Sequence, residues 1–337
     1  MISISNSDII KTTNLTKVFE KNKPCPHKSI IKKFVYYFKP DKEKIIALNN
    51  FNITIKEGEF VGLVGQNGAG KTTLVKILSG ILTPNSGFAK CNSFVPYIER
   101  EKYVANIGVV FGSRSVLEYN LPVIDSLRLY SVIYNLNKQE SEKRIDYLAN
   151  ILEIKDLLNT PVRKLSLGQK MRCNLLASFL YNPKIVFLDE PTIGLDALVK
   201  EKVRNFLKEI NEKEKVTILL TTHDMDDIEE LCERIVLINK GEKLYDGSLD
   251  SFKDQYLKTK YITVTYSQTK DKEKFEKLKS KIKFTNMSKN YFEGEINIKD
   301  SSKTIESLFN CLDITDLNVK EAPLEDMIKD IYCELKR

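Results

Sequence analysis

A glycine-rich stretch between an apolar run and a helical pattern is the first part of the sequence that could perform chemistry. Residues 65–72 read Gly-Gln-Asn-Gly-Ala-Gly-Lys-Thr, which fits the phosphate-binding pattern Gly-x-x-x-x-Gly-Lys-Ser/Thr. Glycines allow backbone conformations that a Cβ excludes, so successive N–H groups can surround a phosphate. We expect Lys71 to reach the β- and γ-phosphates and Thr72 to bind Mg²⁺. The predicted nucleotide-binding residues here are Gly65, Gln66, Asn67, Gly68, Ala69, Gly70, Lys71, Thr72 and Thr73.

Two acidic residues end a second apolar run, and a histidine ends a third. Asp189 is predicted to hold Mg²⁺, whereas Glu190 could orient the attacking water. His223 would lie where a contact with a γ-phosphate is available. An Asp-Glu pair can also form a solvated turn, and a lone histidine is more often structural. A phosphate-binding loop needs an acidic partner, however, so we favour the catalytic interpretation.

A third motif, LSLGQK at residues 165–170, opens a helical stretch. Ser166 is predicted to be the N-cap, and Gly168 and Gln169 fall in the first turn, where free N–H groups can bind an anion. Nothing else in the chain obviously needs a second helix end that binds phosphate. We therefore expect this end to close on the ATP held by a second copy.

The order of the surrounding elements predicts an α/β fold with a mostly parallel sheet. Helical patterns alternate with short apolar or β-branched runs, as in βαβ units. A hairpin is predicted at 235–247, with its turn at Lys240-Gly241. After about Phe252 the texture changes, and residues 261–337 predict a small α+β domain. The expected strands are 12–19, 51–55, 59–64, 184–188 and 216–220, and the expected helices are 70–82, 122–136 and 141–152.

The composition is that of a globular protein. The 337 residues are 42% hydrophobic and 29% charged, and no run reaches the roughly eighteen apolar residues of a membrane span. The first residues lack the pattern of a signal peptide. Six dispersed cysteines without a Cys-x-x-Cys pair indicate reduced thiols in the cytoplasm, and Cys25 with His27 supplies too few ligands for a metal site.

A basic segment at 21–44 interrupts the first part of the chain. It holds eight lysines against two acidic residues, and the whole chain carries a net charge of +7. Apolar residues between Ile30 and Phe38 recur at helical spacing, with Lys28, Lys32 and Lys39 on a basic face. This predicted helix could lie on an anionic membrane or the membrane partner, or pack on its own domain with its lysines solvated. Both alternatives stay open.

Together these motifs make residues 12–250 resemble an ATP-binding-cassette (ABC) ATPase. The stretch at 165–169 is similar to the family signature LSGGQ, with Leu167 in place of a glycine, and 191–196 is similar to the D-loop. The resemblance implies that Asp196 lies at a dimer seam and that His223 is the switch histidine.

Two further positions follow from the resemblance. It implies that Phe19 stacks on adenine, although core packing is the alternative for this side chain. It also places Ser113 where the family carries the glutamine of the Q-loop, which contacts Mg²⁺ and the attacking water. Because serine is shorter, we expect either that a water molecule bridges the gap between Ser113 and the metal or that hydrolysis and coupling are weaker.

The implied fold is a P-loop NTPase with a RecA-like core, an antiparallel β subdomain and a helical subdomain at about 114–182. The expected domains are 1–252, which binds nucleotide, and 253–337, an accessory α+β domain. Stretches near residues 110–126 and 323–332, with the insertion, also resemble drug-exporter subunits.

The predicted function is therefore ATP hydrolysis, with Mg²⁺, that drives a separate membrane permease. Two copies would enclose two ATP molecules at the cytoplasmic face of the membrane. One alternative is a soluble ABC ATPase acting on nucleic acid or the ribosome, which the positive charge supports; the single P-loop and single signature argue against it. Another is a weakly hydrolysing regulatory cassette, suggested by Ser113.

Overall fold

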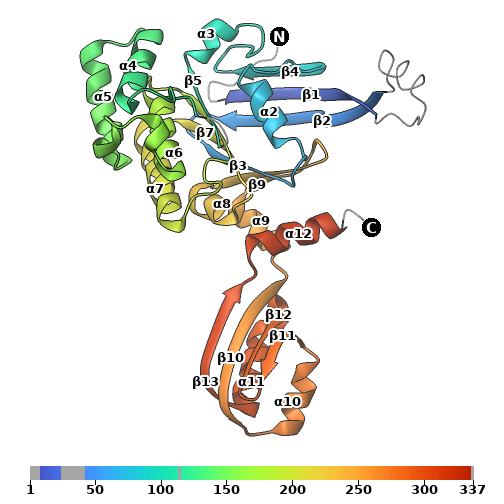
Figure 1. Ribbon diagram of the computed structural model, residues 1–337. Helices are drawn as coiled ribbons and strands as arrows, with labels where there is room; N and C mark the ends of the chain where they lie inside the picture. The colour runs from blue at the N-terminus through green and yellow to red at the C-terminus, as the bar shows by residue number, and fades with distance from the viewer. Residues whose placement is uncertain (1–7, 24–41, 113–114, 335–337) are drawn as a thin grey trace, which may run out of the picture. The chain divides into compact units, whose positions relative to one another are not determined.

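The computed structural model describes residues 8–23, 42–112 and 115–334. The chain divides into two compact units, Met1–Ser248 and Leu249–Arg337 (Figure 1). In the described part of the chain, no helix is both long enough and apolar enough to span a bilayer. Ser113 and the predicted basic helix within 21–44 lie outside the described residues.

A six-stranded sheet forms the centre of the first unit. Its order is β5-β6-β7-β3-β8-β9, and every neighbouring pair is parallel except the last. The middle strands are continuous apolar runs because both faces of a parallel sheet are covered. Lys240 and Gly241 have φ angles of 47° and 81°, so the predicted hairpin turn is confirmed. The strands are β3 (Phe60–Val64), β5 (Ile107–Phe111), β6 (Ile185–Asp189), β7 (Thr217–Thr221), β8 (Arg234–Asn239) and β9 (Glu242–Ser248).

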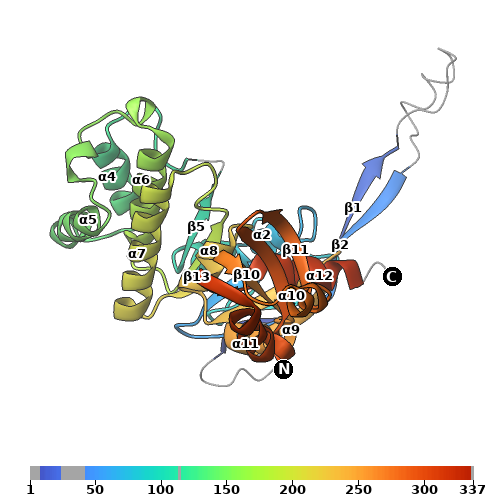
Figure 2. The ribbon, with the colours of Figure 1, turned by 90° about the horizontal axis from the view of Figure 1, so that it is seen from below.

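A second, antiparallel sheet has the order β2-β1-β4. It consists of β1 (Asp8–Asn22), β2 (Lys42–Lys56) and β4 (Ser86–Cys91). The β1–β2 ladder continues out to the pair Asn22 and Lys42. Residues at both ends of the expected insertion are thus strand residues that lengthen this hairpin (Figure 2).

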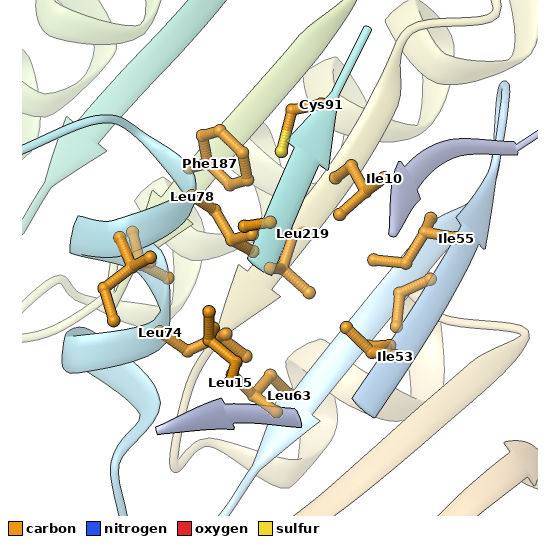
Figure 3. Close-up of a cluster of buried hydrophobic side chains, with 14 of the residues drawn as sticks. Ile10, Leu15, Ile53, Ile55, Leu63, Leu74, Leu78, Cys91, Phe187 and Leu219 are labelled. Carbon is orange, nitrogen blue, oxygen red and sulfur yellow. The ribbon is translucent and has the colours of Figure 1, made fainter. Parts of the chain in front are cut away.

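The hydrophobic core of this unit joins both sheets to α2. Ile10 and Leu15 of β1, Leu74 and Leu78 of α2, and Phe187 of β6 meet in one buried cluster (Figure 3). This packing holds the residues that follow β3 and β6 against one another. The helices next to the six-stranded sheet are α2 (Lys71–Leu78), α3 (Arg100–Val104), α7 (Ala197–Glu214) and α8 (Met225–Leu231).

Three further helices, α4, α5 and α6, gather beside α7 (Figures 1 and 2). Arg144 of α5 crosses to Glu214 of α7 with two hydrogen bonds of 2.5 and 2.7 Å. Phe179 of α6 packs edge-on against Phe206 of α7. These helices are α4 (Val123–Ile133), α5 (Lys138–Ile151) and α6 (Leu167–Phe179), with 3₁₀ turns at Lys155–Leu157 and Val162–Lys164.

The second unit has a four-stranded antiparallel sheet in the order β11-β12-β10-β13. Ile262, Val264 and Phe292 of this sheet share a buried cluster with Phe275 of α10 and Leu308 of α11. The sequence analysis did not predict β11 and β13 as separate strands. The elements are α9 (Leu249–Tyr256), β10 (Thr259–Thr269), α10 (Lys272–Lys279), β11 (Ile282–Ser288), β12 (Tyr291–Asn297), a 3₁₀ turn (Ile298–Asp300), α11 (Ser301–Cys311), β13 (Leu312–Glu321) and α12 (Leu324–Glu334).

Candidate functional site

The glycine-rich loop lies between β3 and α2, at the carboxyl edge of the six-stranded sheet. Because β6, β7 and β3 are adjacent and parallel, the segments that follow them meet at this edge. The loop beginning at Gly65, the acid Glu190 and the segment beginning at Thr222 are therefore neighbours. Ligands of open α/β sheets bind at this edge.

The loop itself requires glycine at two positions for different reasons. Gly70 has φ 114°, and a Cβ there would lie 2.4 Å from the carbonyl oxygen of Ala47. A Cβ on Gly65 would lie 2.5 Å from the carbonyl oxygen of Ile238. Gln66, Asn67 and Gly68 are exposed, so their backbone groups are accessible to an anion.

Lys71, the first residue of α2, points back into this loop. Its Nζ donates hydrogen bonds to the carbonyl oxygens of Gly65 at 2.6 Å and Gln66 at 3.3 Å. Only 5% of the residue is exposed. Burial lowers the pKa of the ammonium group, while the charges of Glu190 and Asp189 raise it. The lysine charge is thus placed beside the acidic residues that the sequence analysis singled out.

Asp189 and Thr72 form an oxygen-rich pair. The Thr72 hydroxyl donates to Asp189 Oδ1 at 3.2 Å, and the Thr221 hydroxyl donates to the same oxygen at 2.5 Å. A hydroxyl and a carboxylate are the oxygen donors that Mg²⁺ prefers, so these residues fit the ion. The sequence analysis missed Thr221, which holds Asp189 in place; its only signal was a polar residue ending an apolar strand.

Glu190 and His223 lie together at the end of β6 and after β7. His223 Nδ1 is 3.3 Å from Glu190 Oε1. Glu190 has a φ of 56°, a left-handed backbone conformation uncommon for a side chain of its size. The backbone N–H of Glu190 donates to the carbonyl oxygen of Thr221 at 2.9 Å, which stabilises this conformation. The His223 side chain is 58% exposed and can reach a ligand.

Gly112, which directly follows β5, packs against Asp189 and Glu190 at the end of β6. Its N–H donates to the carbonyl oxygen of Asp189 at 2.8 Å, and a Cβ there would lie 2.2 Å from the carbonyl oxygen of Glu190. Gly112 is not among the site residues predicted from the sequence. Ser113, the next residue, lies outside the described residues.

The predicted N-cap at Ser166 is confirmed. Its hydroxyl accepts from the Gln169 N–H at 3.3 Å, and Gln169 Oε1 accepts from the Ser166 N–H at 2.9 Å, which is a capping box. Gly168 packs against Val199, which lies in the N-terminal turn of α7. Among the described residues, no hydrogen bond joins Ser166, Gly168 or Gln169 to the glycine-rich loop.

Two further predicted residues lie outside this cluster. Asp196 is the N-cap of α7, and its carboxylate accepts from the Val199 N–H at 3.0 Å. Phe19 lies on β1 opposite Ile45 and is 37% exposed, with Lys17 Nζ 5.3 Å from its ring centroid. Its exposure disfavours the core-packing alternative and leaves a ring face available for stacking.

Residues 48–193 match the family model described as ABC transporter. The chain is 32% identical over 212 residues to the ABC transporter ATP-binding protein NatA of Bacillus subtilis, covering 63% of this chain and 86% of NatA. It is 35% identical over 209 residues to the probable multidrug ABC transporter ATP-binding protein YbhF of Escherichia coli, covering 62% of this chain and 36% of YbhF. It is 32% identical over 234 residues to the glucose import ATP-binding protein GlcV of Saccharolobus solfataricus, covering 67% of this chain and 64% of GlcV.

A solved structure shows the same fold. It is a dimeric, post-hydrolysis state of an ATP-binding cassette bound to ADP and phosphate, with a TM-score of 0.60 and 28% identity. The similarity covers 71% of this chain and 98% of that one.

Proposed function

Because this chain belongs to the ATP-binding proteins of ABC transporters, we propose that it is the ATP-hydrolysing subunit of an exporter with a separate membrane permease. The observation that carries the proposal is the meeting of Lys71, Thr72, Asp189 and Glu190 at one sheet edge. These residues bind phosphate, supply ligands for a divalent ion and orient a water molecule. ABC ATPases of this fold hydrolyse ATP, and the chemistry of these side chains is suited to that reaction.

The chemistry of each side chain indicates its role in the proposed reaction. Lys71 and the N–H groups of residues 65–73 bind the phosphates. Thr72 and Asp189 would hold Mg²⁺, which offsets the negative charge of the phosphates when bound. Glu190 accepts a hydrogen bond from the attacking water and polarises it, and His223 is placed to contact the transferred phosphoryl group. Phe19 offers a ring face for adenine.

The remaining predicted residues support a site shared between two copies. Ser166, Gly168, Gln169 and Asp196 have no hydrogen bond to their own glycine-rich loop in the described part of the chain. The capped end of α6 still presents N–H groups to an anion. The dimeric ATP-binding cassette with the same fold supports this arrangement. In our proposal these four residues face the ATP of the partner.

A groove lined in part by Val116 is suited to receive a helix of the permease. It has a volume of about 320 Å³, and its lining combines apolar and aromatic side chains with polar ones, including Ile81, Tyr130, Tyr181, Ser79, Arg100 and Ser178. Tyr134 stacks on Tyr181 with ring centroids 3.8 Å apart, and both rings line this groove. Val116 follows Gly112 by four residues, and Gly112 packs against Glu190, so a helix docked in this groove would be coupled to Glu190.

Export is supported by the resemblance of residues 110–126 and 323–332 to drug-exporter subunits and by the similarity to YbhF. The similarity to GlcV supports import as the second candidate direction. In either case the chain would act at the cytoplasmic face of the membrane, where the basic residues of 21–44 could meet anionic lipid.

The chemical part of the proposal is tested by Glu190→Gln. We expect ATP turnover to fall by about 10²- to 10⁴-fold, because the amide cannot accept the proton of the attacking water, while ATP binding persists. Glu57→Gln is the matched control, since Glu57 is exposed at the opposite end of β3. Turnover within twofold of the wild type in Glu190→Gln would remove Glu190 from the mechanism.

The partner is tested by capturing the tagged chain from detergent-solubilised native membranes and identifying bound proteins by mass. A stoichiometric multi-span protein supports the transporter, and transport by both proteins in inverted vesicles gives the direction. Ribosomal proteins or nucleic acid without such a protein would favour the soluble alternative. Ser113→Gln tests the regulatory alternative, because unchanged turnover would remove its main support.

A further inference from the structure

A buried carboxylate on α8 connects the two loops that carry Glu190 and His223. Asp227 is fully buried. Its Oδ2 accepts a hydrogen bond of 2.5 Å from the Thr192 hydroxyl and one of 3.3 Å from the Thr222 hydroxyl. Thr192 lies two residues after Glu190, and Thr222 directly precedes His223. One side chain thus bonds to both loops.

The charge of Asp227 is compensated from α7. Arg204 Nε donates to Asp227 Oδ1 at 2.7 Å, and Arg204 Nη1 donates to Glu230 at 2.7 Å. The Arg204 side chain is only 11% exposed, so this pair is well shielded from water. A buried carboxylate without such partners would be strongly destabilising, and with them it is a fixed acceptor. The hydroxyls of Thr192 and Thr222 therefore bond to a carboxylate whose position is fixed.

A second ion pair also connects α7 to the segment that precedes α8. Lys200 Nζ lies 2.5 Å from Asp224 Oδ2, and Asp224 directly follows His223. Lys200 is in the first turn of α7, whose N-cap is Asp196. The segment Glu190–Asp196 and the segment Thr222–Asp224 are consequently joined both through Asp227 and through α7.

By contrast, the side chains of Glu190 and His223 hold each other only weakly. They share one contact of 3.3 Å, and the His223 side chain is mostly exposed. Glu190 also has a left-handed backbone, which needs support from its surroundings. Their relative position depends on what holds the two loops together.

We propose that Asp227 is a positioning residue that, through Thr192 and Thr222, fixes Glu190 and His223 relative to each other for ATP hydrolysis. This inference rests on the proposed function of these two residues. Asp227 touches neither substrate nor reacting atoms and acts only through the loops. A displacement of about 1 Å at a reacting group can cost roughly 100-fold in rate, so losing one hydrogen bond should be visible in turnover.

The probe is Thr192→Val, which removes the hydroxyl and keeps the shape of the side chain. We expect kcat to fall about tenfold while the KM for ATP stays within twofold, because residues 65–73 are unchanged. Thr192→Ser restores a hydroxyl and should restore most of kcat. The matched control is Thr217→Val, which removes another buried threonine hydroxyl that accepts from the Gly58 N–H at 2.9 Å, at the far end of β7.

A double variant shows whether Thr192 acts by fixing Glu190 relative to His223. In the His223→Ala background, Thr192→Val should lower kcat by much less than in the wild type. Equal losses in both backgrounds, an equal loss in Thr217→Val, or no rescue by Thr192→Ser would each overturn the inference. If His223→Ala slows turnover and Thr192→Val does not, the inference alone fails. If His223→Ala has no effect, the proposed role of His223 fails, and the inference fails with it.

Discussion

Single residues at the sheet edge combine tight sterics with opposing charges. Lys71 is 5% exposed, and burial lowers its pKa, whereas the nearby Glu190 and Asp189 raise it. The lysine can be enclosed as a cation because two carboxylates face it. Gly70 allows this enclosure, since its φ of 114° turns the chain into α2 while its backbone passes the carbonyl of Ala47.

We expect an added methyl group to lower the free energy of unfolding by different amounts at Gly68 and at Gly70. Gly68→Ala should destabilise by about 1 kcal/mol, because its φ is 80° but a Cβ would meet nothing within 4 Å. Gly70→Ala should cost several times more, because its Cβ would lie 2.4 Å from a carbonyl oxygen. Urea unfolding of both variants measures the difference. Equal losses would contradict the geometry of the loop.

At the scale of elements, helix ends serve both stability and the proposed function. Ser166 caps α6 with a capping box, and Asn137 caps α5 by accepting from the N–H groups of Gln139 and Glu140. Both caps compensate free N–H groups, and only α6 belongs to the predicted shared site. Comparing variants of Ser166 and Asn137 therefore distinguishes the structural role of a cap from a role in the proposed shared site.

Ser166→Ala and Asn137→Ala should each lower the free energy of unfolding by about 1 kcal/mol. In addition, Ser166→Ala should weaken ATP-dependent dimerisation, whereas Asn137→Ala should leave it unchanged. Thermal unfolding and light scattering with ATP measure the two effects. If both variants impair dimerisation to the same extent, the end of α6 has no special role in the dimer.

The contact between α7 and the start of α8 predicts a pH dependence. Burial by itself would raise the pKa of Asp224, but the hydrogen bond and charge of Lys200, with the charge of Arg204, bring it below its ordinary value of 3.8. A carboxylate with a lowered pKa in the folded state stabilises above its unfolded pKa, and this stability is lost as the pH falls through the folded pKa.

Lys200→Met should therefore destabilise by about 1 kcal/mol at pH 7. The difference from the wild type should shrink as the pH falls below the ordinary pKa of 3.8 and through the lowered pKa of Asp224 in the folded state. Urea unfolding at several pH values from 7 to 3 measures this trend. Lys208→Met is the control on an exposed position of the same helix. A pH-independent difference in Lys200→Met would show that the ion pair is not the cause.

At the scale of the whole molecule, each unit has its own hydrophobic core. The cluster around Leu63 and Phe187 draws its buried members from the first unit, and the cluster around Val264 and Phe292 draws them from the second. A unit with its own core can fold alone. This division falls between Ser248 and Leu249, a few residues before the expected boundary at 252 and 253.

A chain truncated after Ser248 should fold and bind ATP with an affinity within about threefold of the full chain, since residues 65–73 and their supports lie in the first unit. Calorimetry and nucleotide titration measure stability and affinity. Aggregation of the truncated chain, or loss of ATP binding, would contradict the independence of this unit.

The local motifs and the class of fold follow from the order of residues along the chain. The glycine-rich loop, the acids after β6, the Ser166 cap and the Lys240-Gly241 turn depend on residues close together in the chain, and backbone sterics and hydrogen-bonding rules act at that range. Alternation of apolar strands and helices was enough to predict a parallel α/β sheet. The strands β11 and β13 were missed because their exposed residues leave little apolar pattern.

Contacts between residues far apart in the chain depend on the tertiary fold. Thr221 reaches Asp189, Gly112 reaches Glu190, and Asp227 reaches Thr192 because β5, β6 and β7 are neighbours in the sheet. No pattern within the chain encodes that strand order; it results from packing both sheets and α2 around one core. Hydrogen bonds act over about 3 Å, so these contacts exist only once packing has brought the strands side by side.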